Sequence, residues 1–228
     1  MEKRNAYSAL LAVCLLWACS KSDDNTIAAP EVVYDQELTA TFYTGGNSDA
    51  PNTNWNGDKG SFGLQKSMIG LSIDPTTGVL LWNKLLPPGN HTIEVIAFNN
   101  VGKIIVPITI ENPLVGKFKG DLFPALHLIG HTDFVLEFNF KEDGALIGFR
   151  QFKNEESEIL GPFPFFGSWV ADGNMVQGDF QYEEVDDPKP FGGSIVQTEQ
   201  KVVLSGQYWP DSNCDICTTF ELELVIEQ

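Results

Sequence analysis

Two cysteines and two histidines are the residues of this chain whose types and spacing most clearly suggest chemistry. Cys214 and Cys217 are spaced C-x2-C, and His127 and His131 are spaced H-x3-H. Cysteines at this spacing can form a disulfide, act as a redox pair at the start of a helix, or complete a tetrahedral zinc site with the histidines. Because no helix is expected there and the two pairs lie far apart in reversed order, we predict a disulfide and no bound metal.

Motifs of nucleophilic, metal-dependent and nucleotide-dependent catalysis are missing from the sequence. It contains no G-x-S-x-G, no H-E-x-x-H and no P-loop. A glycosidase needs only two carboxylates, but the chain has 31 Asp and Glu residues and singles out no pair. We therefore predict a protein that is not an enzyme, with no catalytic residue and no cofactor.

The chain is strongly acidic, with 14 Lys and Arg residues and a formal net charge of −17. Residues 113–228 alone hold 20 acidic and 7 basic residues. This charge repels phosphates, so we expect no nucleic-acid partner, and it leaves neutral glycans, small apolar molecules or a basic protein surface as ligands. "EEVDDP" (183–188) is interpreted as a solvated acidic loop, with calcium left open and unassigned.

Exposed aromatic side chains are candidates for stacking against a sugar ring. Trp55 lies in an Asn-rich segment, and Tyr208 and Trp209 precede a proline, so we take these three as candidate ligand-binding residues. The denser aromatic stretch "GPFPFFGSW" (161–169) is interpreted as a loop running into a core strand.

The first residues have the pattern of an export signal. Lys3 and Arg4 form a charged start, and Ala6 to Ala18 is apolar apart from Ser8. That run is shorter than the about 20 residues of a transmembrane helix and suits a signal-peptide core. Export brings the chain into a disulfide-permissive compartment, which supports the disulfide prediction.

Leu16-Trp17-Ala18-Cys19 resembles the lipobox of bacterial lipoproteins. The resemblance implies a signal peptide over residues 1–18, acylation of Cys19, a tether over 19–30 and a membrane partner. The acidic pair after the cysteine resembles the surface-export signal of Bacteroidota lipoproteins, which implies an outer-membrane, surface-exposed location. The periplasmic face is the alternative.

The elements that would position these residues are β-strands, because short alternating runs separated by Gly, Asn, Asp and Pro recur from residue 32 onward. A boundary at Asn112-Pro113 divides the chain into modules 31–112 and 113–228. In the first module we expect an extended loop over 44–67. Residues 70–110, with the turn Asp74 to Gly78 and glycines at 89 and 102, resemble the putative-immunoglobulin, cadherin-like modules of bacterial surface proteins, which implies an immunoglobulin-like β-sandwich.

The second module offers eight strands, near 115–120, 134–140, 145–152, 165–170, 175–182, 191–197, 201–209 and 218–226. Apolar and polar residues alternate in these strands, as in an antiparallel sheet around one core. We predict a small antiparallel β-barrel, with a second β-sandwich as the alternative. Gly116 to Gly120 and Gly167-Ser168-Trp169 resemble patterns of lipocalin-like lipoproteins.

Together these features predict a non-catalytic, lipid-anchored cell-envelope protein that binds a glycan or a protein and is raised on an immunoglobulin-like spacer. Two alternatives remain open. One is a lipocalin-like carrier with an apolar cavity lined by Phe134, Leu136 and Phe138, and the other is an envelope polysaccharide hydrolase. Ligand identity, calcium binding and oligomeric state are not predicted.

Overall fold

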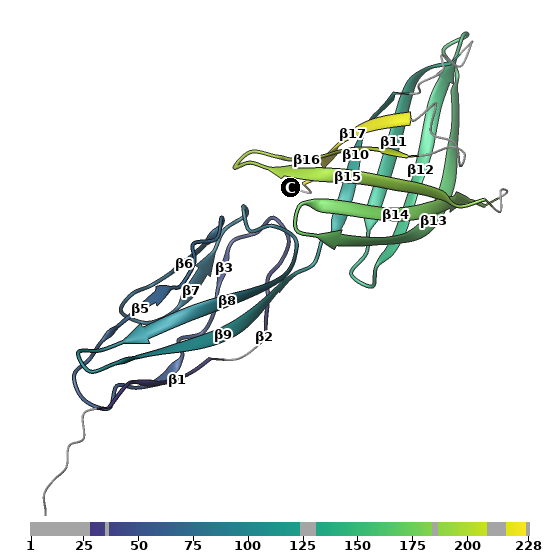
Figure 1. Cartoon of the computed structure of the whole chain (residues 1–228). Coiled ribbons are helices and arrows are strands. Elements are labelled where there is room, and N and C mark those ends of the chain that lie inside the picture. The colour runs from purple at the N-terminus through teal and green to yellow at the C-terminus, as the bar shows by residue number, and fades with distance from the viewer. Residues whose placement is uncertain (1–27, 35–36, 124–130, 184–186, 209–217, 227–228) are drawn as a thin grey trace, which may run out of the picture.

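The computed structural model describes residues 28–34, 37–123, 131–183, 187–208 and 218–226. Two β domains stand end to end, an immunoglobulin-like sandwich and a barrel (Figure 1). This confirms the predicted fold class. Among the described residues, none forms a helix long and apolar enough to cross a membrane.

In the first domain two sheets face one another across an apolar core. The sheet β2-β9-β8-β5 opposes the sheet β3-β7-β6, while β1 and β4 pair as a separate ribbon. β2 pairs with β9 in parallel and the other pairs are antiparallel. The bounds are β1 Glu31–Val33, β2 Glu37–Thr39, β3 Gly46–Asn47, β4 Asn52–Asn54, β5 Ser61–Leu64, β6 Leu71–Ile73, β7 Leu80–Trp82, β8 Gly89–Phe98 and β9 Lys103–Asn112.

The expected loop over 44–67 is the part of this domain where the prediction was wrong. Three of the strands, β3, β4 and β5, lie within it. Phe62 in β5 is buried and pairs with Ala97 of β8. The stretch Ser61–Leu64 is too short to show an alternating pattern, so its place in the sheet depends on pairing with a strand about thirty residues further along the chain.

The second domain is a closed antiparallel barrel of eight strands, because β10 pairs with both β11 and β17. Closure leaves no free edge and rules out the alternative of a second sandwich. The bounds are β10 Gly116–Phe123, β11 His131–Phe140, β12 Ala145–Asn154, β13 Ile159–Asp172, β14 Met175–Tyr182, β15 Lys189–Gln197, β16 Val202–Tyr208 and β17 Thr218–Leu224. "GPFPFFGSW" is therefore part of strand β13 rather than a loop leading into a strand.

Inward-facing glycines let the barrel close tightly around phenylalanine rings. In three of the glycine–phenylalanine pairs between neighbouring strands, the phenylalanine ring occupies the space next to the glycine, namely Gly148 with Phe165, Gly178 with Phe191 and Gly206 with Phe220. A Cβ at Gly206 would come within 2.7 Å of Cζ of Phe220, and one at Gly178 within 2.7 Å of Cε1 of Phe191. Only glycine leaves the space that each ring occupies.

Phe138 of β11 is at the centre of the aromatic cluster that fills the middle of the barrel. Its side chain is fully buried, and its ring centroid lies 5.0 Å from that of Phe191 and 5.4 Å from that of Phe220. Other rings surround it at 5.7 to 5.9 Å, those of Phe140, Phe165 and Phe180. Such contacts stabilise a core by packing and by favourable ring geometry. The middle of the barrel is therefore a packed core.

The two domains meet through both apolar and polar contacts. Phe42 from the turn after β2 and Leu114 from the connection between the domains are buried in the core of the barrel. The Gln197 side chain at the end of β15 donates hydrogen bonds to the Lys84 and Leu86 carbonyls, at 2.9 and 3.2 Å. These contacts hold the two domains against one another.

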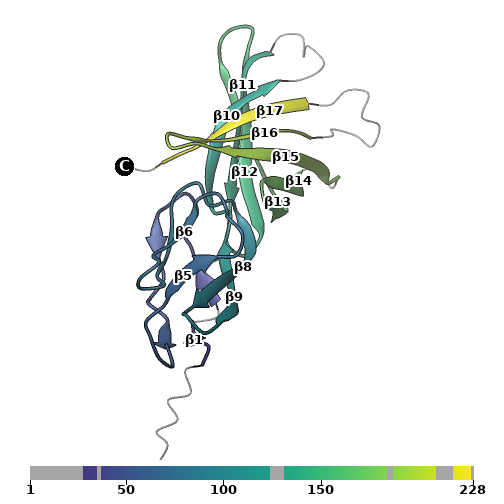
Figure 2. The same cartoon turned by 60° about the vertical axis from the view of Figure 1, so that its left-hand side comes forward.

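The N-terminal end of the described chain lies at the opposite end of the first domain from the barrel (Figures 1 and 2). The Asn99 side chain donates to the Ala28 carbonyl at 3.0 Å, which places Ala28 beside the turn at the end of β8. The start of β8, at Gly89, lies instead beside Gly173 of the barrel. A ten-residue strand is about 33 Å long, so the first domain holds the barrel at least that far from its entry point.

We predict that Gly206→Ala destabilises the protein by about 1–3 kcal/mol, because the new methyl group collides with the Phe220 ring and the Gly192 carbonyl. Urea denaturation followed by circular dichroism measures the change. Gly63→Ala in β5 is the matched control, since nothing lies within 4 Å of its added Cβ. Equal shifts of the unfolding midpoint in the two variants would contradict the role given to Gly206.

Candidate functional site

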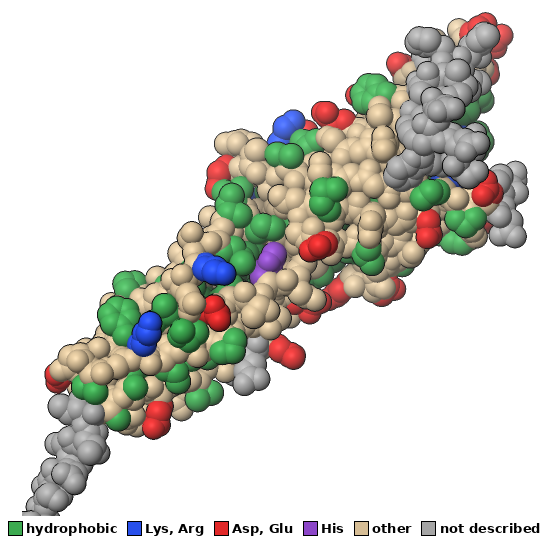
Figure 3. Space-filling model, viewed as in Figure 1, with side chains coloured by type: hydrophobic (Ala, Val, Ile, Leu, Met, Phe, Trp, Pro, Cys, Tyr) green, Lys and Arg blue, Asp and Glu red, His purple; other side chains and the backbone are tan. Residues whose placement is uncertain are grey.

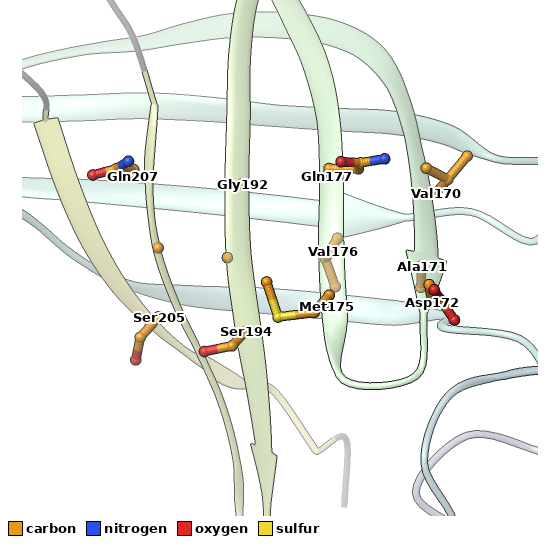
Figure 4. A pocket seen from close by; sticks show the side chains of 12 residues that line it. Val170, Ala171, Asp172, Met175, Val176, Gln177, Gly192, Ser194, Ser205 and Gln207 are labelled. Carbon is orange, nitrogen blue, oxygen red and sulfur yellow. The ribbon is translucent and has the colours of Figure 1, made fainter. Parts of the chain in front are cut away.

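A groove of about 680 Å³ lies on the outer wall of the barrel over β13 to β16. Two rows of directly paired residues cross these four strands. One row is Val170, Gln177, Gly192 and Gln207, and the other is Asp172, Met175, Ser194 and Ser205. Figure 4 shows the two glutamines on either side of Gly192. The volume of the groove falls within the range of small-molecule sites.

The chemistry of the groove is neutral and rich in hydrogen-bonding groups. Gln177 and Gln207 each offer two donors and one acceptor oxygen, and Ser194 and Ser205 add hydroxyls. Asp172 at one end is the one ionisable side chain among the lining residues. Val170 and Met175, 58 % and 60 % exposed, add apolar surface. The groove thus suits an uncharged polar ligand with some apolar faces.

Strand spacing sets the width of the groove. Gln177 on β14 and Gln207 on β16 both pair with Gly192 on β15, so their backbones are two strand spacings, about 10 Å, apart. Gly192 has no side chain to fill the space between them. A ring or chain unit lying over Gly192 would therefore have a glutamine on each side of it.

Missing side chains on the inner surface also shape the wall at this point. Gly193 and Gly206 are paired with each other, and a Cβ on either would approach backbone atoms of the neighbouring strand. With no side chain to hold it away, this part of the wall lies close against the Phe220 ring. The depression on the outside is thus a consequence of the inward glycines.

The surroundings of the groove are acidic, although its lining is not. Figure 3 shows acidic side chains spread over the visible face of the barrel. Glu221 and Glu223 face outward on β17, next to β16. An anionic ligand approaching the wall is repelled by these charges, which favours a neutral ligand.

Two of the predicted aromatic residues are described, and neither lies in the groove. Trp55 packs edge-on against Phe62 at 5.1 Å and belongs to the core of the first domain. Tyr208 is 4 % exposed and packs against Phe180 at 5.3 Å inside the barrel. The expectation that Tyr208 is an exposed stacking face is therefore wrong, because its place in β16 gives it the inward orientation of Leu204 and Gly206.

Several predicted sites lie outside the described residues. These are the lipidation site Cys19, the stacking candidate Trp209, the disulfide pair Cys214 and Cys217, and one histidine of the rejected zinc set, His127. Among the described residues no three or more His, Cys, Asp or Glu side chains gather as metal ligands. The pairing of the cysteines stays a prediction.

An inward-facing arginine is the feature that the sequence analysis missed. Arg150 of β12 continues the inward series Leu146 and Gly148, and its Nε is buried without a hydrogen-bond partner among the described residues. Leu146 and Gly148 are apolar positions, so an arginine two residues further on the same face was a signal available in the sequence. Apart from Arg4, it is the chain's only arginine.

Comparisons with known proteins add little to this description. No family model and no curated protein matches the chain. A solved structure that is similar in part is the crystal structure of human protocadherin-24 EC1-2, form II, at 9% sequence identity and a TM-score of 0.36. The match covers 88% of this chain and 100% of that chain. The strand pairing described above, and not this likeness, defines the fold.

Proposed function

We propose that this protein is a non-catalytic, lipid-anchored binding protein of the bacterial cell envelope that holds a neutral glycan in the groove over β13 to β16. The observation that carries the proposal is the pair of glutamine side chains on the two strands that flank Gly192. Amides and hydroxyls in a neutral setting complement sugar hydroxyls, which are both donors and acceptors. The lining nominates no pair of carboxylates for hydrolysis, since Asp172 stands alone in it.

The arrangement of the two domains supports the anchoring part of the proposal. In the proposed lipoprotein, acylated Cys19 sits in the outer membrane and residues 19–30 form the tether. The described chain then enters the first domain at the end opposite the barrel. The groove would thus be held away from the membrane by the length of the first domain, where an external glycan can reach it.

The packed middle of the barrel is the reason for placing the ligand on the wall. An apolar ligand carried as in a lipocalin would have to displace Phe138, whose side chain is fully buried among other rings. A core of this density offers no room without repacking. The outer groove needs no such change.

We predict that the whole chain carrying Cys19→Ala binds neutral oligosaccharides on a glycan array in preference to uronate-containing ones. The double variant Gln177→Ala, Gln207→Ala should bind the same oligosaccharides about tenfold more weakly, because each lost hydrogen bond contributes about 0.5–1.5 kcal/mol. Isothermal titration calorimetry with the tightest array ligand measures the loss.

Gln181→Ala is the matched control for this experiment. Gln181 is on the outer face of the same strand β14 but outside the groove. The Gln181→Ala variant should therefore bind the oligosaccharide as tightly as the unaltered protein does. An equal loss in both variants, or preference for uronate-containing glycans, would show that the groove is not the glycan site.

The anchor is tested separately from the ligand. Cys19→Ala should move the protein from the membrane fraction to the soluble fraction and abolish incorporation of labelled palmitate, because the thiol is the acylation point and stable anchoring needs acyl chains. Cys14→Ala, a cysteine within the signal peptide, is the control and should leave both readouts unchanged. If the Cys19 variant stays membrane-bound and labelled, the lipoprotein assignment fails.

A further inference from the structure

Arg150 lies inside the barrel at the end away from the first domain. It pairs with Leu136 of β11 and Phe163 of β13, and on β12 it follows the inward residues Leu146 and Gly148. An arginine facing the inside of a barrel has to be compensated, since burying a charge without a partner is costly. The question is what compensates Arg150.

Aromatic rings supply part of the compensation. The Cζ atom of the guanidinium lies 5.0 Å from the ring centroid of Tyr182, 5.7 Å from that of Phe152 and 5.9 Å from that of Phe163. The Phe152 and Phe163 rings are themselves stacked at 5.4 Å, with an interplanar angle of 16°. Rings attract the face of a guanidinium but do not accept its in-plane N–H groups.

One of the in-plane donors of Arg150, and a neighbouring hydroxyl, are left without acceptors. The Nε of Arg150 and the hydroxyl of Tyr182 are both buried, and neither has a hydrogen-bond partner among the described residues. The four ion pairs of the described chain do not include Arg150. The Nε–H of Arg150, which is charged, and the neighbouring Tyr182 hydroxyl therefore both favour an acceptor that carries negative charge.

The Tyr182 hydroxyl stays a donor across the physiological pH range. Burial, followed by the charge of the neighbouring Tyr208, raises the pKa of Tyr182, and the positive charge of Arg150 opposes this only in part. An interaction with the Tyr208 hydroxyl also raises this pKa, but no partner of the Tyr182 hydroxyl among the described residues meets hydrogen-bonding geometry. The Tyr182 hydroxyl is therefore available as a donor.

Solvent reaches this end of the barrel, in contrast to its middle. Phe163 is 39 % exposed, whereas Phe138 is fully buried. Lys189 near the same end pairs with Asp187, so its charge is balanced. Arg150 is the cation here that lacks a carboxylate partner in the described part of the chain.

We propose that Arg150 and Tyr182 form a second binding site, distinct from the glycan groove, for a small carboxylate that carries a flat apolar group. The carboxylate accepts hydrogen bonds from the Arg150 guanidinium and the Tyr182 hydroxyl. The flat group lies against the exposed face of Phe163. The overall acidity of the barrel does not prevent this, because the site is on the inner surface and Glu221 and Glu223 face outward.

A probe experiment on the whole chain tests this site without reference to the glycan. In a chain carrying Cys19→Ala and Arg4→Lys, Arg150 is the single arginine, so its Nε–H gives one cross-peak in a proton–nitrogen NMR spectrum. Benzoate should shift that peak saturably, with a dissociation constant of about 1 mM or lower. Benzyl alcohol, which has the ring without the charge, should not.

Two variants and a control test whether Arg150 and Tyr182 bind the benzoate. Tyr182→Phe keeps the ring and removes the hydroxyl, and should weaken benzoate binding about fivefold to tenfold. Arg150→Gln should weaken it by about tenfold or more, measured by the saturation-transfer signal of benzoate. Lys153→Gln, which removes a cation of the same strand that pairs with Asp133, should bind benzoate unchanged.

No shift with benzoate up to about 10 mM, an equal shift with benzyl alcohol, or an equal loss in the Lys153 variant would each overturn the proposal. The two buried donors would then be satisfied by water alone. None of these outcomes tests the groove, because Gln177 and Gln207 lie on the outer surface of the wall and Arg150 on the inner surface.

Discussion

Three glycine–phenylalanine pairs across neighbouring strands determine what the barrel can do. At Gly148, Gly178 and Gly206 the inner surface has no side chain, and the paired ring of the next strand fills the space. The rings therefore reach the axis and pack around Phe138. Close packing of this kind makes the middle of the barrel a source of stability. The ligand of the proposed binding protein would have to be recognised elsewhere.

The outer groove, the inner site and the domain junction all follow from this core. Where Gly193 and Gly206 let the wall lie close to Phe220, its outer face forms the groove. Towards one end the phenylalanines give way to Arg150 and Tyr182, and the inner surface becomes polar. At the other end Phe42 of the first domain completes the core. The first domain is thus also part of the barrel's packing.

Most of the barrel was predictable from the alternation of apolar and polar residues. An apolar residue at every second position, as in β11 and β17, is typical of a strand with one buried face. The pairing of Ser61–Leu64 with β8 and the groove were not predictable, since both depend on register between separated strands. Tyr208 was misplaced because an aromatic before a proline at a strand end was taken as exposed. Arg150 was missed although its inward position follows from Leu146 and Gly148.

The central claim is that the ligand lies on the outer wall and leaves the packed middle of the barrel undisturbed. Backbone amide shifts of the whole chain, recorded while the tightest-binding neutral oligosaccharide is titrated in, test it most directly. The account predicts that the largest changes fall on Gln177, Gly192, Ser205 and Gln207, with little change at Leu136 and Phe138. Changes concentrated at Leu136 and Phe138, with the groove amides unmoved, would contradict it.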